Sequence, residues 1–280
     1  MTGQEGRPAG AGVAVHPSAH VSPDARLLGP GTEIGPGAVV GKDVVVGPGT
    51  QVGPYAILEG LTVIGRDNRI GPHAVVGAPA QVRRGAEGGR LVVGDGNTIR
   101  EFVTIHAGSA GGVTRLGDRS LLMAYVHVAH DCELEDELEL ANGVQLAGHV
   151  VVGHHAVIGG LAAVHQLVRI GAGAMVGAGS MVSQDVLPHA LVSGDRARLY
   201  GVNTVGLRRR GADAARRREL ERAFRMLRSV DTLAHGIDRV RGEVELTVEV
   251  RELLQFLERG GRRGYCRPSA GGRGSASCDG

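Results

Sequence analysis

Aliphatic residues recur at every sixth position along most of the chain. The series runs through Ile34, Val40 and Val46, and it continues without a break from Leu116 to Val182, always as Val, Ile or Leu. A second small or apolar residue follows each aliphatic position by four residues. Neither the 3.6-residue period of a helix nor the alternation of a plain strand gives this spacing. The pattern predicts a parallel β-helix, in which each hexad is a short strand and a corner with its aliphatic side chain inside.

The hexads also resemble a known superfamily. Sequences such as IGPGAV (34–39), IGRDNR (64–69) and VGHHAV (152–157) are similar to those of the hexapeptide-repeat transferases. The period alone leaves the number of sides and the handedness open. The resemblance implies a mainly β fold, a three-sided left-handed parallel β-helix in which three hexads complete one coil.

The repeat also divides the chain. We expect a flexible N-terminus over 1–12, the β-helix over 13–203, and loops at 78–92 and 106–115, where the six-residue register breaks. Long excursions from a rigid scaffold are common places for binding residues. From 204 to 258 the apolar spacing becomes helical, which predicts a small α-helical C-terminal domain. The members of this pattern are Leu220, Phe224, Leu227, Val230 and Leu233, then Val250, Leu253, Leu254 and Leu257. Residues 259–280 read as a disordered tail.

Composition narrows the class of protein. The chain has no Trp, 3 Phe and 47 Gly, which favours a narrow interior of small branched side chains. A net charge of +2 is too balanced to indicate a nucleic-acid partner. Neither a signal segment nor a long apolar run is seen, so we expect no membrane insertion and a cytoplasmic location. Cys132, Cys266 and Cys278 lack disulfide or metal spacing, and Cys132 occupies an inward, core position.

Polar residues gather at positions that stacked coils would bring together. With three hexads to a coil, equivalent residues of neighbouring coils lie about 4.8 Å from each other. His130, Gly148 and Gln166 then form one column, and Asp131 and His149 form the column beside it. Three segments distant in sequence would therefore meet on one outer edge of the prism.

These residue types suit acyl transfer. A histidine beside an aspartate can act as a general base whose charged form the carboxylate stabilises, which gives His130 and Asp131 catalytic roles. The Gly148 N–H can donate to a developing oxyanion. No Ser or Cys stands where a covalent nucleophile would be needed, so direct attack by a hydroxyl is favoured. We interpret His154, His155 and the acidic run 133–139 as solvated surface instead.

Longer motifs point to one family. LLMAYVHVAHDC (121–132), LAGHVVVG (146–153), AAVHQ (162–166), GVNTVGLRRRG (201–211) and NTIREFVTIHAG (97–108) resemble the acyl-carrier-protein-dependent UDP-N-acetylglucosamine 3-O-acyltransferases. The resemblance implies the first step of lipid A biosynthesis, acyl carrier protein and UDP-N-acetylglucosamine as partners, and a homotrimer with sites between prisms. We expect no cofactor and no metal ion. The substrate-binding residues it implies are His127, His149, His165, Gln166, Asn203, Arg209 and Arg210.

The chain departs from this family in one loop and near the acyl site. Where the family reads QDLKY, this sequence reads QVRRG (81–85), so Val82 replaces an aspartate and Arg84 replaces a substrate-binding lysine. Since Arg84 keeps the positive charge, the resemblance implies that it too is a substrate-binding residue. Ala178 stands where members tune acyl length, and Arg196 is altered nearby. The acyl chain and the hydroxyl or amine identity of the acceptor stay open.

Two alternatives to this function remain. One is a hexapeptide transferase acting on another sugar nucleotide. The other is a zinc hydratase resembling the γ-type carbonic anhydrases, for which the spacing of His149 and His154 is suitable. Zinc sites usually need three protein ligands, and no third histidine completes this set.

Overall fold

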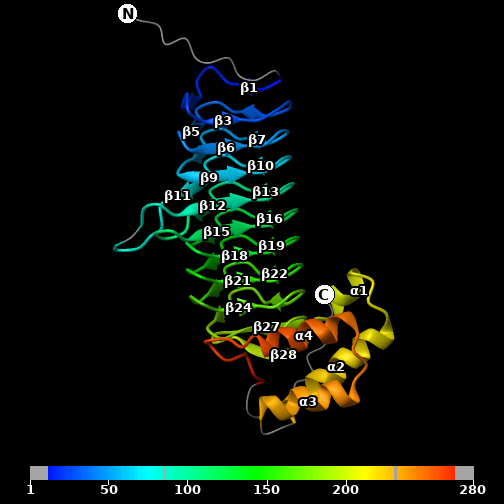
Figure 1. Cartoon of the computed structure of the whole chain (residues 1–280). Coiled ribbons are helices and arrows are strands. Elements are labelled where there is room, and N and C mark those ends of the chain that lie inside the picture. The colour runs from blue at the N-terminus through cyan, green and yellow to red at the C-terminus, as the bar shows by residue number, and fades with distance from the viewer. Residues whose placement is uncertain (1–11, 85, 230–231, 269–280) are drawn as a thin grey trace, which may run out of the picture.

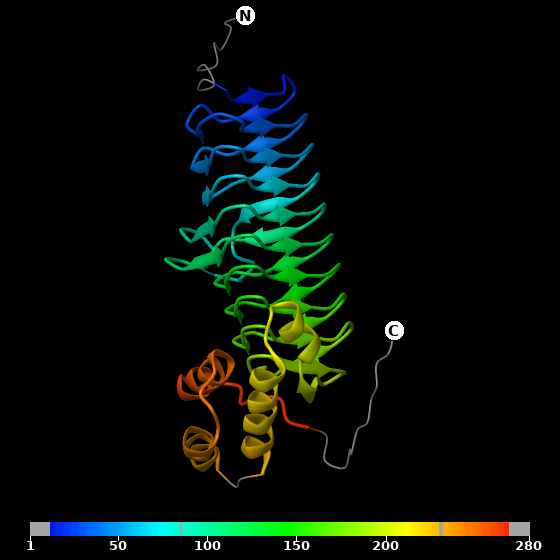
Figure 2. The same cartoon turned by 90° about the vertical axis from the view of Figure 1, so that its right-hand side faces the viewer.

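Three parallel sheets form the sides of a long prism, and a group of helices lies beyond its last coils (Figures 1 and 2). The computed structural model describes residues 12–84, 86–229 and 232–268. Equivalent residues pair between successive coils, as His127 does with Gln145 and Ala163 with Met181. The parallel β-helix predicted from the hexads is confirmed, and so are the three sides that the resemblance implied.

Each sheet takes every third strand from β1 to β26, and β27 and β28 extend sheet 1. Sheet 1 contains β1 (Ala14–Val15), β4 (Glu33–Ile34), β7 (Gln51–Val52), β10 (Arg69–Ile70), β13 (Thr98–Ile99), β16 (Leu121–Leu122), β19 (Glu139–Leu140), β22 (Val157–Ile158), β25 (Met175–Val176), β27 (Ala190–Ser193) and the antiparallel β28 (Arg198–Val202). Sheet 2 contains β2 (His20–Val21), β5 (Val39–Val40), β8 (Ile57–Leu58), β11 (Val75–Ala78), β14 (Thr104–His106), β17 (His127–Val128), β20 (Gln145–Leu146), β23 (Ala163–Val164) and β26 (Met181–Val182). Sheet 3 contains β3 (Arg26–Leu27), β6 (Val44–Val46), β9 (Leu61–Ile64), β12 (Arg90–Val93), β15 (Val113–Leu116), β18 (Glu133–Leu134), β21 (Val151–Val152) and β24 (Arg169–Ile170).

The repeated aliphatic residues fill the prism. Every sixth residue from Leu116 to Val182 is buried, with at most 3% of its surface exposed. The inward position four residues later is buried as well, and Cys132 occupies one of these positions, as expected. Burial raises the pKa of the Cys132 thiol to about 12, so this cysteine is a packing residue.

The corners between sheets place side chains in columns. Asp131 and His149 both have left-handed backbones, with φ of 59° and 60°. The N–H of His149 donates to the carbonyl of His130 in the previous coil, at 3.0 Å. Because this hydrogen bond recurs from coil to coil, each corner residue lies directly beside its equivalent in the next coil.

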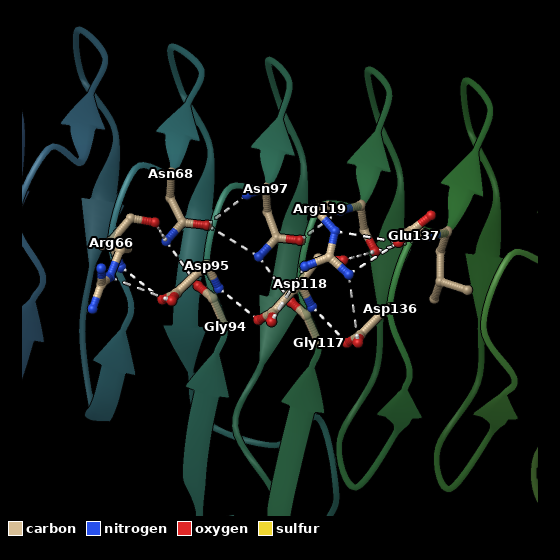
Figure 3. A network of polar contacts seen from close by, with 12 residues as sticks. Arg66, Asn68, Gly94, Asp95, Asn97, Gly117, Asp118, Arg119, Asp136 and Glu137 are labelled. Atoms are coloured by element: carbon tan, nitrogen blue, oxygen red, sulfur yellow. Dashed lines mark hydrogen bonds and ion pairs between the residues drawn. The ribbon is translucent and has the colours of Figure 1, made fainter.

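A ladder of polar residues runs along the corner between sheets 3 and 1 (Figure 3). Inside the prism, the buried Asn97 donates its side-chain N–H to Asn68 at 3.0 Å. Outside, the Asp118 carboxylate accepts the Asp95 N–H and the Asp136 carboxylate accepts the Asp118 N–H, each at 2.8 Å. The acidic run 133–139 is therefore in part a structural ladder, in which Asp136 accepts a backbone hydrogen bond while its side chain stays 50% exposed.

Two loops leave the prism near its middle. The first spans 79–89, between β11 and β12, and projects sideways in Figure 1. The second spans 107–112, between β14 and β15. Both are shorter than the predicted 78–92 and 106–115, because 90–93 and 113–116 pair with each other in register as strands.

The described part of the C-terminal region contains four helices. They are α1 (Thr204–Arg209), α2 (Ala214–Arg228), α3 (Leu233–Glu243) and α4 (Val248–Glu258). The apolar series read as one helix face from Leu220 to Leu233 in fact covers two helices. The side chain of Thr232 accepts the His235 N–H and starts α3 there, and Val230 lies outside the described residues. None of the helices in the described chain is long and apolar enough to cross a membrane.

The segment after α4 is ordered against the prism, in contrast to the expected tail. Tyr265 forms a β-bridge with Asp185, and the N–H of Cys266 donates to the Asp185 carbonyl at 2.8 Å. Cys266 is buried in the hydrophobic core, with 2% of its surface exposed. The described segment that ends at 268 is therefore packed against the rest of the protein. Residues 269–280, which include Cys278, and 1–11 of the expected flexible N-terminus lie outside the described residues.

Candidate active site

A histidine and an aspartate form a close pair at the corner between β17 and β18. His130 Nδ1 lies 2.8 Å from Asp131 Oδ2, and the two side chains are 17% and 11% exposed. Since a carboxylate only accepts hydrogen bonds, this contact assigns the proton to Nδ1. The Nε2 atom of His130 is then the nitrogen left to accept a proton from a substrate.

The environment of Asp131 favours its charged form. Burial would raise the pKa of Asp131, but hydrogen bonds from His130 and Ser109, with His149 nearby, hold it below its usual value. A carboxylate that stays ionised near neutral pH stabilises a positive imidazolium beside it. Ser109 lies on the second loop, and sequence reasoning missed it because irregular loops have no register.

The next coil brings Gly148 and His149 to the same corner, in the columns predicted. A Cβ atom on Gly148 would lie 2.7 Å from Cε1 and Nε2 of His130, so only glycine leaves room for the ring. His149 Nε2 lies 3.7 Å from Asp131 Oδ2, with its ring edge-on to His130. Two imidazoles therefore lie beside one carboxylate, and the Gly148 backbone lies against the His130 ring.

His127 lies on β17, on the outer surface of sheet 2. Its Nδ1 is 2.8 Å from the Thr104 hydroxyl, and the His106 ring packs edge-on at 5.3 Å. Burial, and to a lesser extent His106, lower the pKa of His127. A neutral His127 near the pair is suited to hydrogen bonding with an uncharged ligand group.

His165 and Gln166 lie one coil beyond Gly148 and His149 and are exposed. Arg263, from the ordered segment after α4, donates its Nε–H to the Gln166 carbonyl at 3.1 Å, and its Nη2 contacts the His165 ring. This arginine was assigned to a disordered tail, and no feature of its local sequence indicated the contact.

Three further predicted substrate-binding residues lie at the opposite edge of sheet 3. Asn203 begins α1 and donates to the carbonyl of Gly173, which stands between β24 and β25. Arg209 is exposed and Arg210 is half-buried close by. Within one chain, this group is therefore not brought to His130, which stands between β17 and β18.

His154 is not solvated surface but part of an ionic chain between prism and helices. Its Nδ1 lies 3.0 Å from Glu135, and its Nε2 lies 3.4 Å from Glu252 on α4. The second oxygen of Glu252 lies 2.7 Å from His189, whose Nδ1 faces Arg210 at 3.4 Å. Hydrogen bonds to Glu135 and Glu252 raise the pKa of His154 to about 10. We call the set Glu135, His154, Glu252, His189 and Arg210 the interdomain network.

Arg84 and Val82 lie on the first loop, where Arg84 is exposed and Val82 partly exposed. The base of this loop contacts the end of β14, directly before the second loop, because His106 Nδ1 lies 2.7 Å from the Pro79 carbonyl. The second loop in turn contacts Asp131 through Ser109. The first loop is thus a neighbour of the candidate site, without an observed contact between Arg84 and the pair.

The corner is also the one place in the described chain where three potential metal ligands converge. Atoms of His130, Asp131 and His149 lie within 4.8 Å of one another. The zinc-hydratase alternative instead paired His149 with His154. These two stand at different corners, on either side of β21, and His154 is bound by carboxylates. The histidine set of that alternative is not formed.

A three-sided parallel β-helix with a histidine–aspartate pair at one corner defines a hexapeptide-repeat acyltransferase. The bacterial transferase hexapeptide profile matches residues 27–60, and a profile described as UDP N-acetylglucosamine O-acyltransferase, domain 2, matches 185–266. The chain belongs to the acyl-(acyl-carrier-protein)–UDP-N-acetylglucosamine O-acyltransferase family.

Similar proteins of this name cover almost the whole chain. That of Thermodesulfovibrio yellowstonii is 42% identical, and that of Halorhodospira halophila is 46% identical, each over 90% of this chain and 99% of the relative. The crystal structure of the UDP-N-acetylglucosamine acyltransferase of Francisella novicida superposes with a TM-score of 0.86 at 30% identity, covering 91% of this chain and 95% of that one. The left-handed fold class implied by the resemblance is shown by this structural agreement.

Proposed function

We propose that this protein transfers a (3-hydroxy)acyl group from acyl carrier protein to the 3-hydroxyl of UDP-N-acetylglucosamine, the first step of lipid A biosynthesis. The name of its relatives supports both substrates. The observation that carries the proposal is the His130–Asp131 pair, 2.8 Å apart, with the Gly148 backbone against the His130 ring.

The proposed reaction is a direct acyl transfer. His130 Nε2 takes the proton of the sugar 3-hydroxyl while that oxygen attacks the thioester carbonyl. Asp131 stabilises the imidazolium, and the Gly148 N–H donates to the oxyanion of the tetrahedral intermediate. When the intermediate collapses, the carbon–sulfur bond breaks and the thiolate takes the proton from His130. Ester and free carrier thiol are the products, and no residue is acylated.

We also propose that the working form is a homotrimer with each site between two prisms. The positions of Asn203 and Arg210 support this, since they lie at the opposite edge of sheet 3 from His130. A neighbouring chain that presents this edge to the His130 corner would complete the substrate-binding set. The cytoplasmic location remains a prediction.

Mass spectrometry of the UDP-sugar tests the function directly. The purified protein is incubated with UDP-N-acetylglucosamine and a panel of carrier-protein thioesters of different length and hydroxylation, which also resolves the effect of Ala178 and Arg196. His130→Ala should lower turnover by about 10²–10⁴-fold, the usual effect of losing a general base. His20→Ala, on the exposed strand β2 of an early coil, serves as the matched control and should remain active.

Three results would contradict this proposal. Near-normal turnover by His130→Ala would exclude His130 as the general base. The absence of acylated product with every donor would exclude the proposed reaction. Stoichiometric zinc in active protein would return the hydratase alternative. Equilibrium sedimentation of the same samples tests the trimer.

A further inference from the structure

The second loop donates hydrogen bonds to the carboxylate of Asp131. Ser109 Oγ donates to Asp131 Oδ2 at 2.8 Å, and the Ser109 N–H lies 3.2 Å from both carboxylate oxygens. From the other side, the Asp131 N–H donates to the Thr114 hydroxyl at 2.8 Å. Ser109 within the second loop and Thr114 just after it therefore both hold Asp131 in place, as does His130.

Two glycines of the second loop allow its backbone to come close to the Asp131 carboxylate. A Cβ atom on Gly112 would collide with Asp131 Oδ1, and one on Gly108 would collide with the backbone of Gly112. The loop therefore closes on itself and on the carboxylate, which a chain with larger residues at these positions is unable to do.

We propose that Ser109 is a positioning residue that aims Asp131 at His130, an inference that rests on the proposed function. Asp131 Oδ2 has two imidazole neighbours, His130 at 2.8 Å and His149 at 3.7 Å. The terminal torsion of an aspartate is broad, so the carboxylate by itself turns easily between them. The Ser109 hydroxyl and N–H fix this torsion so that Oδ2 faces His130 Nδ1.

The contacts of Ser109 also distinguish this role from that of a nucleophile. A nucleophilic serine needs a base within hydrogen-bond reach of its hydroxyl. The Ser109 hydroxyl donates to a carboxylate oxygen that already accepts from His130. Ser109 therefore acts on the base through Asp131, and it does not compete with direct attack by the sugar hydroxyl.

Steady-state kinetics of Ser109→Ala and Ser109→Thr test the proposal. Loss of a hydrogen bond to a charged group should lower kcat of Ser109→Ala by about 10–100-fold. The KM values for both substrates should stay within about twofold, since the residue does not touch them. Ser109→Thr keeps the hydroxyl and should restore most of kcat. Ala110→Ser, at the exposed next residue of the same loop, is the matched control and should be normal.

The pH profile supplies a readout that loss of stability would not change. Removing a donor leaves more negative charge on the Asp131 carboxylate, which stabilises the protonated imidazole of His130 and so withdraws the base at higher pH. The decline of kcat on the acid side should therefore shift upward in Ser109→Ala and return in Ser109→Thr. An unshifted profile, a kcat of Ser109→Ala within twofold of wild type, or no rescue by threonine would overturn the inference.

A substrate-free measurement separates this inference from the proposed function. Diethyl pyrocarbonate labels nucleophilic imidazoles, and peptide mass spectrometry reports the labelling rate of His130. We expect a loss of labelling rate in Ser109→Ala and recovery in Ser109→Thr, whichever acceptor the enzyme uses. Equal rates in all variants would refute the positioning role even if the acyl transfer is confirmed.

Discussion

The interdomain network should make the attachment of the helices to the prism depend on pH. Glu252 on α4 contacts His154 and His189 of the prism, at 3.4 and 2.7 Å. Although burial opposes it, hydrogen bonds from these two histidines lower the pKa of Glu252 to about 2. Glu252→Gln keeps the size of the side chain and removes its charge, so it isolates the ionic contribution.

The size of the expected loss of stability follows from how far the ion pairs of Glu252 are buried. Exposed ion pairs contribute about 0–1 kcal/mol, whereas breaking a buried pair costs about 3–5 kcal/mol. The side chains of Glu252 and His154 are 25% and 40% exposed, which places this contact between the two limits. We expect Glu252→Gln to lower the free energy of unfolding by about 1–2 kcal/mol at pH 7.

The sign of the pH dependence follows from the two pKa shifts. The pKa of His154 is raised from 6.5 to about 10, so its stabilising contribution is complete below about 6.5 and is lost as pH rises towards 10. The pKa of Glu252 is lowered from 4.5 to about 2, so its contribution is present above about 4.5 and is lost in acid. The difference in stability between wild type and Glu252→Gln should therefore shrink from pH 6.5 to 10, and again below 4.5.

Urea unfolding, followed by circular dichroism at 222 nm, measures this difference across the pH range. Hydrogen exchange of α4 amides reports whether the loss is local to the helices. Glu245→Gln, an exposed glutamate of the same region, is the control and should match wild type at every pH. Equal stability of Glu252→Gln and wild type at pH 7, or a difference constant up to pH 10, would refute the reasoning.

Two further predictions concern the substrates. Arg225 and Arg228 are exposed on α2. Replacing both with glutamate should raise the KM for carrier-protein thioester several-fold at low salt and less at high salt, because salt screens the electrostatic attraction between the two proteins. An unchanged KM at low salt would exclude α2 as the docking surface for this acidic partner. Val82→Asp should raise kcat/KM for UDP-N-acetylglucosamine by about tenfold, since a carboxylate forms charge-assisted hydrogen bonds with a substrate. Steady-state rates within twofold of wild type would show that the first loop does not reach the substrate, and a loss would indicate a different donor or acceptor.

The sequence alone determined the prism and the histidine–aspartate corner. Repeating geometry is the reason: once a period of six and three sides are assigned, positions three hexads apart in the chain become neighbours in space. The burial of the aliphatic series, the contact of Asp131 with His149 and the fit of Gly148 against His130 all follow from that single rule.

Only the tertiary structure decided the contacts made by segments outside the repeat. Ser109 comes from a loop, Arg263 from a segment after the last helix, and Glu252 from a helix whose docking no periodicity encodes. Their partners depend on how irregular backbone closes back on the prism, and such closure is set by packing and hydrogen bonding between residues far apart in the chain. For this reason the same sequence that indicated where His130 lies gave no indication of what holds Asp131 in place beside it.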